Sequence, residues 1–567
     1  MRQSAAPPSL AVPPAEESLA YVLRALFEPV DRHDAPGLIV GVAQRGRILM
    51  RQGYGLASVA LGVPNTCATR MHIGSTSKHF TCLAALLLAE EGRLEIDAPV
   101  GRYLPEWPQA VTQPTLRQLM THTAGVRCHI DLFPLASGTA MRPAGAVMQA
   151  LLRQSALNFA PGSDFLYSNG GYQLLSEVIA RAAGMPFEQV LQTRIFAPMG
   201  MDETASIPDD NVLVPGLADL HVPQPDGTYR RGFFPIPDCR GEGAMVSTVD
   251  DMLKWLAHLR SPSLIGSAQT WHQMLQTACL DNGETLPYAL GLMRHSYRGV
   301  EVIHHAGGVV GGTCQMLTLP AHELDIILIL NGAPLNPMEL AWRIVDHLLG
   351  PQHLRPVVPR PDMARFRPLA GMRYRDPASG LVIEFADLDG RLALKSWNLM
   401  PVAMHDDGAL LRVGVEDMPE SGIEIAVADL LAGQGAPLVL PVVRGGRPLQ
   451  LQRLPTEPPA NASAGAALVG RYRASDLAAD VRITLQGQSL QMTLQADAPA
   501  VHCVLQAWAP EVFGLSVPGV PEVPLGGVLS VQREAGEVVG LYLDTFRSRR
   551  LWLERLPPDG GVTRIAP

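Results

Sequence analysis

The sequence contains very little lysine. Of its 45 basic residues only three are lysines, at positions 78, 254 and 395, and the other 42 are arginines. Arginine stays protonated inside proteins, whereas a buried lysine can lose its proton and act as a base. Lys78 follows Ser75 by three residues, which makes this lysine a candidate catalytic group, while we expect Lys254 and Lys395 to be solvated.

Several other features are scarce or missing. The seven cysteines are an odd number, are scattered and show no C-x-x-C spacing, which fits free thiols in a reducing compartment. Residues 1–8 are polar and proline-rich without the apolar segment of a signal peptide, so export is not indicated. The aliphatic run over residues 83–89 is far too short to cross a bilayer. These features predict a cytoplasmic protein.

Charge and length exclude further classes. A net charge of −9 argues against a nucleic-acid partner, and 47% apolar with 17% charged residues describes a folded chain. A length of 567 residues predicts two to four domains. A proline-rich segment over 351–361 has the composition of a stiff linker.

The chain repeats itself after this linker. Leu369-Ala370-Gly371 with Tyr374-Arg375 recurs as Leu468-Val469-Gly470 with Tyr472-Arg473, and Leu451-Gln452-Arg453-Leu454-Pro455 recurs as Leu553-Glu554-Arg555-Leu556-Pro557. Short alternating runs with glycine or aspartate turns fill each unit, which predicts two tandem antiparallel β-barrels. We therefore expect a flexible tail (1–15), a first folded domain (16–350), a linker (351–362), a barrel (363–456), a second linker (457–466) and a second barrel (467–567).

The first domain has strand patterns near both ends and helical patterns between them. The strands are expected over 37–43, 47–50, 300–303, 313–318 and 326–330, the first two as a hairpin around the short turn Gln44-Arg45-Gly46. The helices are expected over 17–27, 78–91, 115–120, 144–154, 171–183, 246–260 and 338–349. This order predicts an antiparallel sheet covered by helices, with a helical lobe inserted in the chain between its strands.

Ser75 falls in the first turn of the helix that Gly92 ends. Positions i and i+3 share a helix face, so the Ser75 hydroxyl and the Lys78 amine can approach hydrogen-bonding distance. The N–H groups at the helix start suit a developing oxyanion. An S-x-x-K tetrapeptide also arises by chance in long chains, and its context has to support the catalytic interpretation.

Two further clusters supply that context. Tyr167 and Asn169 lie in a loop before a helix, where a phenol can move a proton and an amide can orient a lysine or a carbonyl. His305, Ala306 and Gly307 follow a β-run whose small residues would let a substrate lie along a strand edge. Taken singly, the first cluster also fits a turn with a buried tyrosine and the second a structural histidine.

Together, Ser75/Lys78, Tyr167/Asn169 and His305-Ala306-Gly307 resemble the three elements of the serine β-lactamase and penicillin-binding-protein superfamily. The loop over 119–125 is also similar to one common in that group. The resemblance implies a β-lactamase/transpeptidase-like catalytic domain, here followed by two lipocalin-like antiparallel β-barrels. It is closest to the D-aminopeptidase branch, which has the H-x-G form and two C-terminal barrels. Since His305 replaces a lysine that attracts carboxylates, anionic substrates are less expected.

The resemblance also implies roles. Ser75 would be the nucleophile, Lys78 or Tyr167 its main base, and the N–H groups of Ser75 and Gly308 the oxyanion hole. Asn169, His305 and Gly307 would orient the substrate, and Glu522, in a loop of the last barrel, would bind its ammonium group unless that loop is an ordinary turn.

The leading hypothesis is therefore a D-aminopeptidase that cleaves amides or short peptides through an acyl-enzyme. An esterase or β-lactamase-like acyl hydrolase and a penicillin-binding sensor without turnover stay open. We expect a small-molecule or short-peptide substrate, no cofactor, no metal, no nucleic-acid or membrane partner, and allow for a homodimer.

Overall fold

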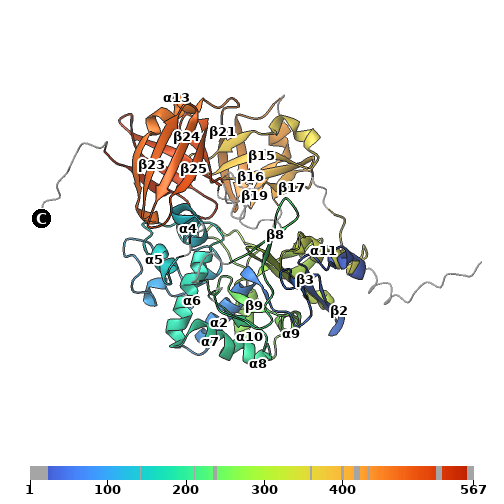
Figure 1. Ribbon diagram of the computed structural model, residues 1–567. Helices are drawn as coiled ribbons and strands as arrows, with labels where there is room; N and C mark the ends of the chain where they lie inside the picture. Colours follow the sequence, from blue (N-terminus) through green and yellow to red (C-terminus); the bar gives the residue numbers. More distant parts are fainter. Residues whose placement is uncertain are drawn as a thin grey trace, which may run out of the picture.

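The chain folds into an α/β part with a helical lobe and two β-barrels that lie side by side against it (Figure 1). The computed structural model describes residues 23–557 apart from 139, 141, 208, 210, 234–238, 358–360, 398–400, 414–421, 432–434 and 519–525. The tail expected over residues 1–15 therefore lies outside the described residues. The described part of the first expected helix, residues 23–27, is helical.

A six-stranded antiparallel sheet forms the centre of the first domain, in the order β10-β11-β12-β13-β1-β2. Its strands are β1 (Leu38–Gln44), β2 (Arg47–Tyr54), β10 (Met293–Tyr297), β11 (Val300–Val309), β12 (Gly312–Leu319) and β13 (Leu324–Leu330). The predicted hairpin joins β1 to β2 through Arg45 and Gly46, which both have positive φ, as two-residue hairpin turns require. The strands from the two ends of this domain meet where β1 pairs with β13.

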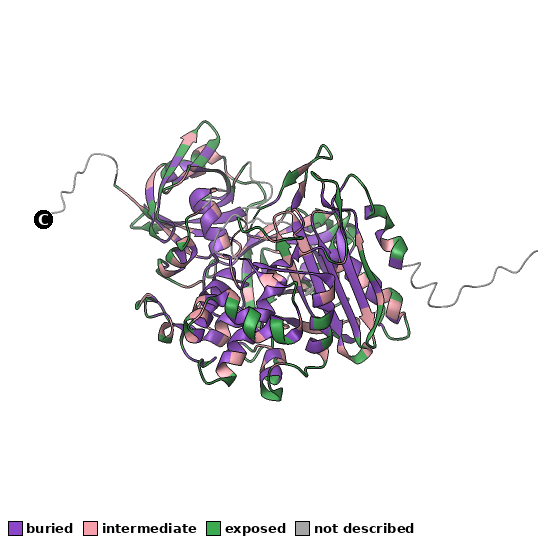
Figure 2. Cartoon of the chain, turned by 60° about the horizontal axis from the view of Figure 1, so that its bottom comes forward, coloured by how far each residue is buried: buried purple, intermediate pink, exposed green. Residues whose placement is uncertain are grey.

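Side chains of the central strands alternate between two apolar cores, because neighbouring residues of a strand point to opposite faces. On β1, Ile39 joins the core under the helical lobe, whereas Val40 and Val42 join the core under α11 (Pro337–Leu349). On β13, Ile327 and Ile326 divide in the same way. Both faces of the sheet are therefore covered, and its central strands β1 and β13 are mostly buried (Figure 2).

The helical lobe packs on the face opposite α11. Its elements are η2 (Gly74–Ser77), α2 (Lys78–Glu90), α3 (Leu116–Met120), α4 (His129–Ser137), α5 (Ala146–Leu152), α6 (Asn169–Ala183), α7 (Phe187–Leu191), α8 (Ala197–Met199), α9 (Val249–Arg260) and α10 (Ala268–Leu275). A small sheet of β5 (Met71–His72), β9 (Met245–Ser247) and β6 (Ala205–Ser206) lies beside them.

The helix expected from residue 246 begins three residues later. Residues 245–247 form β9, which pairs with both β5 and β6. Thr248 then caps α9, because its side chain accepts a hydrogen bond from the Asp251 N–H. The helical period continues back into β9, but the cap and the strand pairing determine where the helix starts.

The C-terminal part forms two closed eight-stranded antiparallel barrels, as expected. The first consists of β14 (Arg373–Arg375), β15 (Val382–Leu388), β16 (Arg391–Ser396), β17 (Val402–Asp406), β18 (Leu410–Val413), β19 (Ile423–Ala426), β20 (Val439–Arg444) and β21 (Arg447–Arg453), with the short helix α12 (Val427–Leu431). The second consists of β22 (Gly470–Ala474), β23 (Ala479–Gln486), β24 (Ser489–Gln495), β25 (Val501–Ala509), β26 (Val512–Ser516), β27 (Gly526–Glu534), β28 (Glu537–Asp544) and β29 (Leu551–Arg555). Between them, within the expected second linker, lies α13 (Asn461–Gly465).

The repeated sequence motifs mark the closure of each barrel. Tyr374 on the first strand of barrel one faces Arg453 on its last strand, and Tyr472 faces Arg555 in barrel two. Both tyrosines are fully buried. The repeats therefore recur because each barrel joins its first strand to its last in the same way.

Barrel two docks on the helical lobe through α4 (Figure 1). Leu132, Leu135 and Ala136 of α4 belong to the same apolar cluster as the core of this barrel. In the part of the chain that the structure describes, no helix is long and apolar enough to cross a membrane.

Candidate active site

Ser75 lies in the 3-10 turn η2, which runs directly into α2. The Ser77 hydroxyl donates to the Gly74 carbonyl at 2.6 Å and accepts from the Met245 N–H at 3.2 Å, so the turn is fixed to β9. Lys78, the first residue of α2, brings its Nζ to 3.1 Å from the Ser75 Oγ. The structure thus places the serine and the lysine in contact, as the spacing predicts.

The Lys78 amine is fully buried and has three oxygen partners. They are the Ser75 Oγ at 3.1 Å, the Asn169 Oδ1 at 2.7 Å and the main-chain oxygen of Glu242 at 2.6 Å. Burial lowers the pKa of Lys78 to about 7. Two of the partners are carbonyl oxygens that can only accept, whereas the Ser75 hydroxyl can donate. A neutral amine fits this set, since its two N–H groups meet the carbonyls and its lone pair faces the serine.

Tyr167 lies beside this amine, in the loop before α6. Its ring centroid is 4.7 Å from the Lys78 Nζ, and its ring packs on His122 with centroids 4.1 Å apart. Ser168 caps α6 by accepting from the Gly171 N–H, which puts Asn169 at the first helical position. The local sequence therefore brings both the Tyr167 ring and the Asn169 amide next to the Lys78 amine.

Strand β11 passes directly over the nucleophile turn. The Thr76 hydroxyl donates to the His305 carbonyl at 3.2 Å, and a Cβ added to Gly307 would lie 1.9 Å from the Ile73 oxygen and 3.2 Å from the Ser75 N. Gly74 has a φ of +53°, and a Cβ there would lie 2.6 Å from the Gly308 N. The two backbones approach this closely because both glycines lack side chains. Gly307 and Gly308 are thereby brought to Ser75, as the sequence predicts.

We expect the Gly307→Ala variant to lose activity by about 10²-fold or more, because the new methyl group forces β11 away from Ser75, and small displacements in an active site have effects of this size. Steady-state rates together with the thermal unfolding midpoint would measure both effects. In the matched variant Gly308→Ala the added Cβ would meet no described atom within 4 Å. Its unfolding midpoint should therefore equal that of the wild type, and equal midpoints and rates for all three proteins would contradict the close packing of β11 on η2.

His305 is neutral and held in a chain of hydrogen bonds. The Ser168 N–H donates to His122 Nδ1 at 3.1 Å, so that His122 Nε2 carries the proton for Tyr288 at 3.1 Å. The Tyr288 hydroxyl in turn donates to His305 Nε2 at 3.1 Å, and His305 Nδ1 donates to the Ala306 carbonyl at 2.6 Å. Burial and the nearby Lys78 lower the pKa of His305 to about 3. His305 therefore provides no positive charge next to the nucleophile turn.

A loop of barrel two reaches this site between β28 and β29. The Arg547 guanidinium lies over the Tyr167 ring, 4.8 Å from its centroid. The Arg547 main chain is held at both polar groups, since its N–H donates to Asp131 Oδ2 at 2.6 Å and its carbonyl accepts from the Cys128 N–H at 3.3 Å. The Thr545 hydroxyl also donates to Asp131, at 2.6 Å. Glu522, the residue expected to reach the site from this barrel, lies outside the described residues. The contact between barrel two and Tyr167 that the structure shows is made by Arg547, in the loop between β28 and β29.

Comparisons with known proteins bear on the whole chain. The sequence model of the family described as Beta-lactamase matches residues 23–350, which is more than half of the chain. The chain belongs to the β-lactamase family. The β-lactamase/transpeptidase-like fold and the superfamily predicted from the sequence motifs are therefore confirmed.

Relatives of this β-lactamase-family chain extend the similarity into the barrels. A D-aminopeptidase of Brucella anthropi is 26% identical over 540 residues, which cover 92% of this chain and 96% of the relative. The structure of an octameric penicillin-binding protein homologue from Pyrococcus abyssi shares the fold with a TM-score of 0.52 at 18% identity, covering 88% of this chain and 97% of that one. The crystal structure of SurE has a TM-score of 0.52 at 25% identity, covering 78% of this chain and 100% of SurE.

The sequence motifs of the β-lactamase family did not point to Arg547, Tyr288 or Glu242. Arg547 begins a basic run, Arg547-Ser548-Arg549-Arg550, which gives no sign of the element it meets. Glu242 lies between two glycines, and a carboxylate flanked by glycines usually marks an exposed loop. In the folded chain Glu242 is only 2% exposed, and its main-chain oxygen contacts Lys78. This burial depends on tertiary packing, which the local sequence does not reveal. Within the described ranges no group of three or more His, Cys, Asp or Glu side chains is arranged to hold a metal ion.

Proposed function

We propose that the protein is a serine hydrolase that removes N-terminal D-amino acids from amides and short peptides through an acyl-enzyme on Ser75. The proposal is supported by the D-aminopeptidase relatives, which match 92% of this chain, and by the arrangement around Ser75. The observation that carries it is the partner set of the Lys78 amine, in which the Ser75 hydroxyl is the group that can donate.

The steps follow from these contacts. Lys78 takes the hydroxyl proton while the Ser75 oxygen bonds to the substrate carbonyl carbon, and the N–H groups of Ser75 and Gly308 hold the resulting oxyanion. When the carbon–nitrogen bond breaks, the Tyr167 phenol donates a proton to the departing amine and recovers one from the Lys78 ammonium. Water then hydrolyses the ester bond to Ser75, with Lys78 or Tyr167 as the base that activates it. Asn169 keeps the amine oriented, and the His305 carbonyl, which accepts from the Thr76 hydroxyl, holds β11 on the nucleophile turn.

A second candidate is an esterase or β-lactamase-like acyl hydrolase. Arg547 favours it, because a guanidinium beside Tyr167 disfavours the ammonium group that a D-aminopeptidase substrate carries. Glu522 would offset this charge if its loop reaches the pocket, and we keep that role for Glu522 as a proposal.

We expect hydrolysis of D-alanine amide with a preference of at least about 10²-fold over L-alanine amide, since one misplaced substituent at the scissile bond has effects of this order. Rates on both amides, on a nitrophenyl ester and on a chromogenic cephalosporin would measure this preference. The matched control is Ser75→Ala, which should be inactive on all four. Ester cleavage without amide cleavage would support the second candidate, and a stable adduct with the cephalosporin would indicate a sensor that does not turn over.

We further propose a cytoplasmic enzyme whose domains divide at residues 351–362 and 457–466, and we allow for a homodimer. The scattered cysteines without C-x-x-C spacing support the cytoplasmic location, and the proline-rich segment over 351–361 supports the first domain boundary. Size-exclusion chromatography with light scattering would test the assembly, and the mass of an octamer would contradict it.

A further inference from the structure

A buried glutamate, Glu242, lies next to the Lys78 amine. Glu242 is 2% exposed, and its main-chain oxygen accepts from Lys78 Nζ at 2.6 Å. The segment that carries it is fixed next to the nucleophile turn, because the Gly241 N–H donates to the Ser176 hydroxyl at 3.0 Å and the Thr81 hydroxyl donates to the Gly241 carbonyl at 2.8 Å. A carboxyl group this deeply buried is costly unless it has a charged partner or is protonated.

The two carboxyl oxygens of Glu242 have different surroundings. Oε2 accepts from the Arg240 N–H at 3.0 Å. Oε1 has no hydrogen-bond partner among the described residues, and it lies 3.4 Å from Nε2 of His129, which is also buried. The pKa of His129 is lowered to about 3 by its burial and by Lys78, so that its imidazole is neutral at ordinary pH. The neutral imidazole has one acceptor and one donor nitrogen, so its Nε2 can accept from a protonated Oε1 in one tautomer and donate to an ionised Oε1 in the other.

The groups around the pair come from four parts of the chain. Lys78 lies on α2, His129 on α4 with Cys128 just before it, Cys239 on the segment of Glu242 itself, and Arg547 on the loop of barrel two. Arg547 disfavours the charged form of Lys78, whereas Glu242 favours it. Burial raises the pKa of Glu242 to about 7, the value to which burial lowers that of Lys78. Two interacting groups with similar pKa values titrate as a unit.

We propose that Glu242 and Lys78 share one proton inside the protein, so that Glu242 holds the proton that the lysine must give up to act as a base. In one form Lys78 is an ammonium and Glu242 a carboxylate; in the other Lys78 is an amine and Glu242 a carboxylic acid. The net charge of the pair is the same in both. When the amine takes the Ser75 proton, the ammonium that forms lies beside a group that can again ionise. This inference rests on the proposed function for its catalytic meaning, but the sharing of the proton does not.

The scarcity of lysine permits a direct test. Protein labelled with ¹³C at the lysine Cε should give three signals, from Lys78, Lys254 and Lys395, whose chemical shifts follow ionisation of each amine. In the wild type the Lys78 signal should titrate near neutral pH. In the Glu242→Gln variant the carboxylate that favours the ammonium is absent, so the pKa of Lys78 should fall by about one unit or more. The signals of Lys254 and Lys395 serve as internal controls and should not move.

The pH profile of kcat/KM supplies the second readout. Activity needs neutral Lys78, so the acid limb should move to lower pH in Glu242→Gln by the same interval, and Glu242→Asp, which keeps the carboxylate, should retain most of the wild-type profile. A Lys78 titration that is unchanged in Glu242→Gln would overturn the inference and leave Glu242 a structural residue. If the titration shifts as expected but no amide or ester is cleaved, the proposed function fails and the shared proton stands.

Discussion

The Lys78→Arg variant is expected to lose about 10³- to 10⁴-fold in kcat while it keeps its fold, because the loss of a general base has effects of this size. Arginine keeps its proton at any accessible pH and offers no lone pair to the Ser75 hydroxyl. In the wild type both N–H groups of the neutral amine meet the oxygens of Asn169 and Glu242. A guanidinium could still donate hydrogen bonds to these oxygens. The variant therefore distinguishes the structural role of Lys78 in the site from its role as a base.

Steady-state rates on the D-amide, with circular dichroism and thermal unfolding on the same samples, would measure this effect. The matched control is Lys254→Arg, since the Lys254 side chain is 50% exposed and pairs with Asp251 at 2.9 Å. This control should have wild-type rates. Wild-type rates in Lys78→Arg as well would exclude Lys78 as the base and leave Tyr167 as the candidate.

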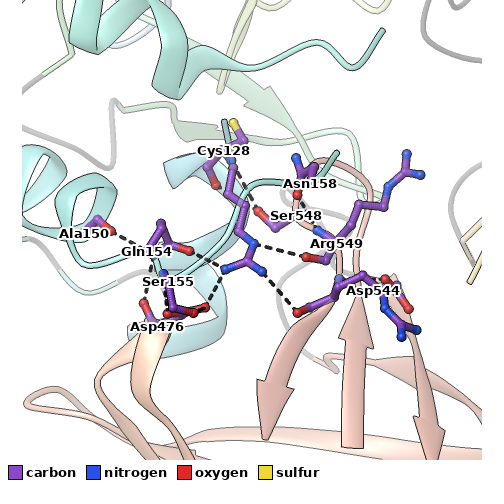
Figure 3. A network of polar contacts seen from close by, with 11 residues as sticks. Cys128, Ala150, Gln154, Ser155, Asn158, Asp476, Asp544, Ser548 and Arg549 are labelled. Carbon is purple, nitrogen blue, oxygen red and sulfur yellow. Dashed lines mark hydrogen bonds and ion pairs between the residues drawn. The ribbon is translucent and has the colours of Figure 1, made fainter. Parts of the chain in front are cut away.

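The second large effect is expected where barrel two meets the helical lobe. Arg127, 1% exposed, donates to Asp476 of the barrel at 2.5 Å and to the main-chain oxygens of Arg549 and Arg550 at 3.1 Å each (Figure 3). Asp476 also accepts from the N–H and the hydroxyl of Ser155, both at 3.0 Å. Burial disfavours the charge of Arg127 and lowers its pKa, while Asp476 counteracts this. Loss of the anion would leave a buried cation without compensation.

Asp476→Asn should therefore lower the free energy of unfolding by about 3–5 kcal/mol, the usual cost of breaking a buried ion pair by changing one partner. Denaturant unfolding would measure this. Activity should fall as well, because the strands beside this contact carry the loop that places Arg547 over Tyr167.

A nearby pair on the same barrel offers the control. Arg473 and Asp480 are 3.2 Å apart and more than half exposed, so Asp480→Asn should change stability by less than about 1 kcal/mol. Equal effects of the two substitutions would contradict the structural importance of the Arg127–Asp476 pair. The double variant Arg127→Met with Asp476→Leu should regain part of the stability, since apolar residues can replace a buried ion pair.

Local patterns were sufficient to predict much of the fold. The hairpin over β1 and β2 followed from two apolar runs separated by a short glycine-bearing turn, and the barrels followed from repeated segments that turned out to be their closing strands. The start of α9 was predicted three residues early, because the helical period does not reveal that residues 245–247 pair with two other strands.

The residues of the candidate site likewise fall into those that local sequence patterns predicted and those that they did not. Ser75 and Lys78 share one helical turn, and Tyr167 and Asn169 share one loop, so spacing along the chain was enough to pair them. Arg547 and Glu242 reach the same lysine from segments far away in the sequence, and no short-range pattern encodes such an approach. The role predicted for Glu522 stays a prediction.

The loop that carries Arg547 joins the surroundings of Tyr167 only late in synthesis. Its Ser548 hydroxyl accepts from the Cys128 N–H, a contact between residues 420 positions apart. During translation, residues 75, 78 and 167 leave the ribosome long before residue 547. A chain whose synthesis stops before residue 545 lacks the guanidinium beside Tyr167 and the donors that hold Asp131. The contacts around Tyr167 and Asp131 therefore form only after almost the whole polypeptide has been made.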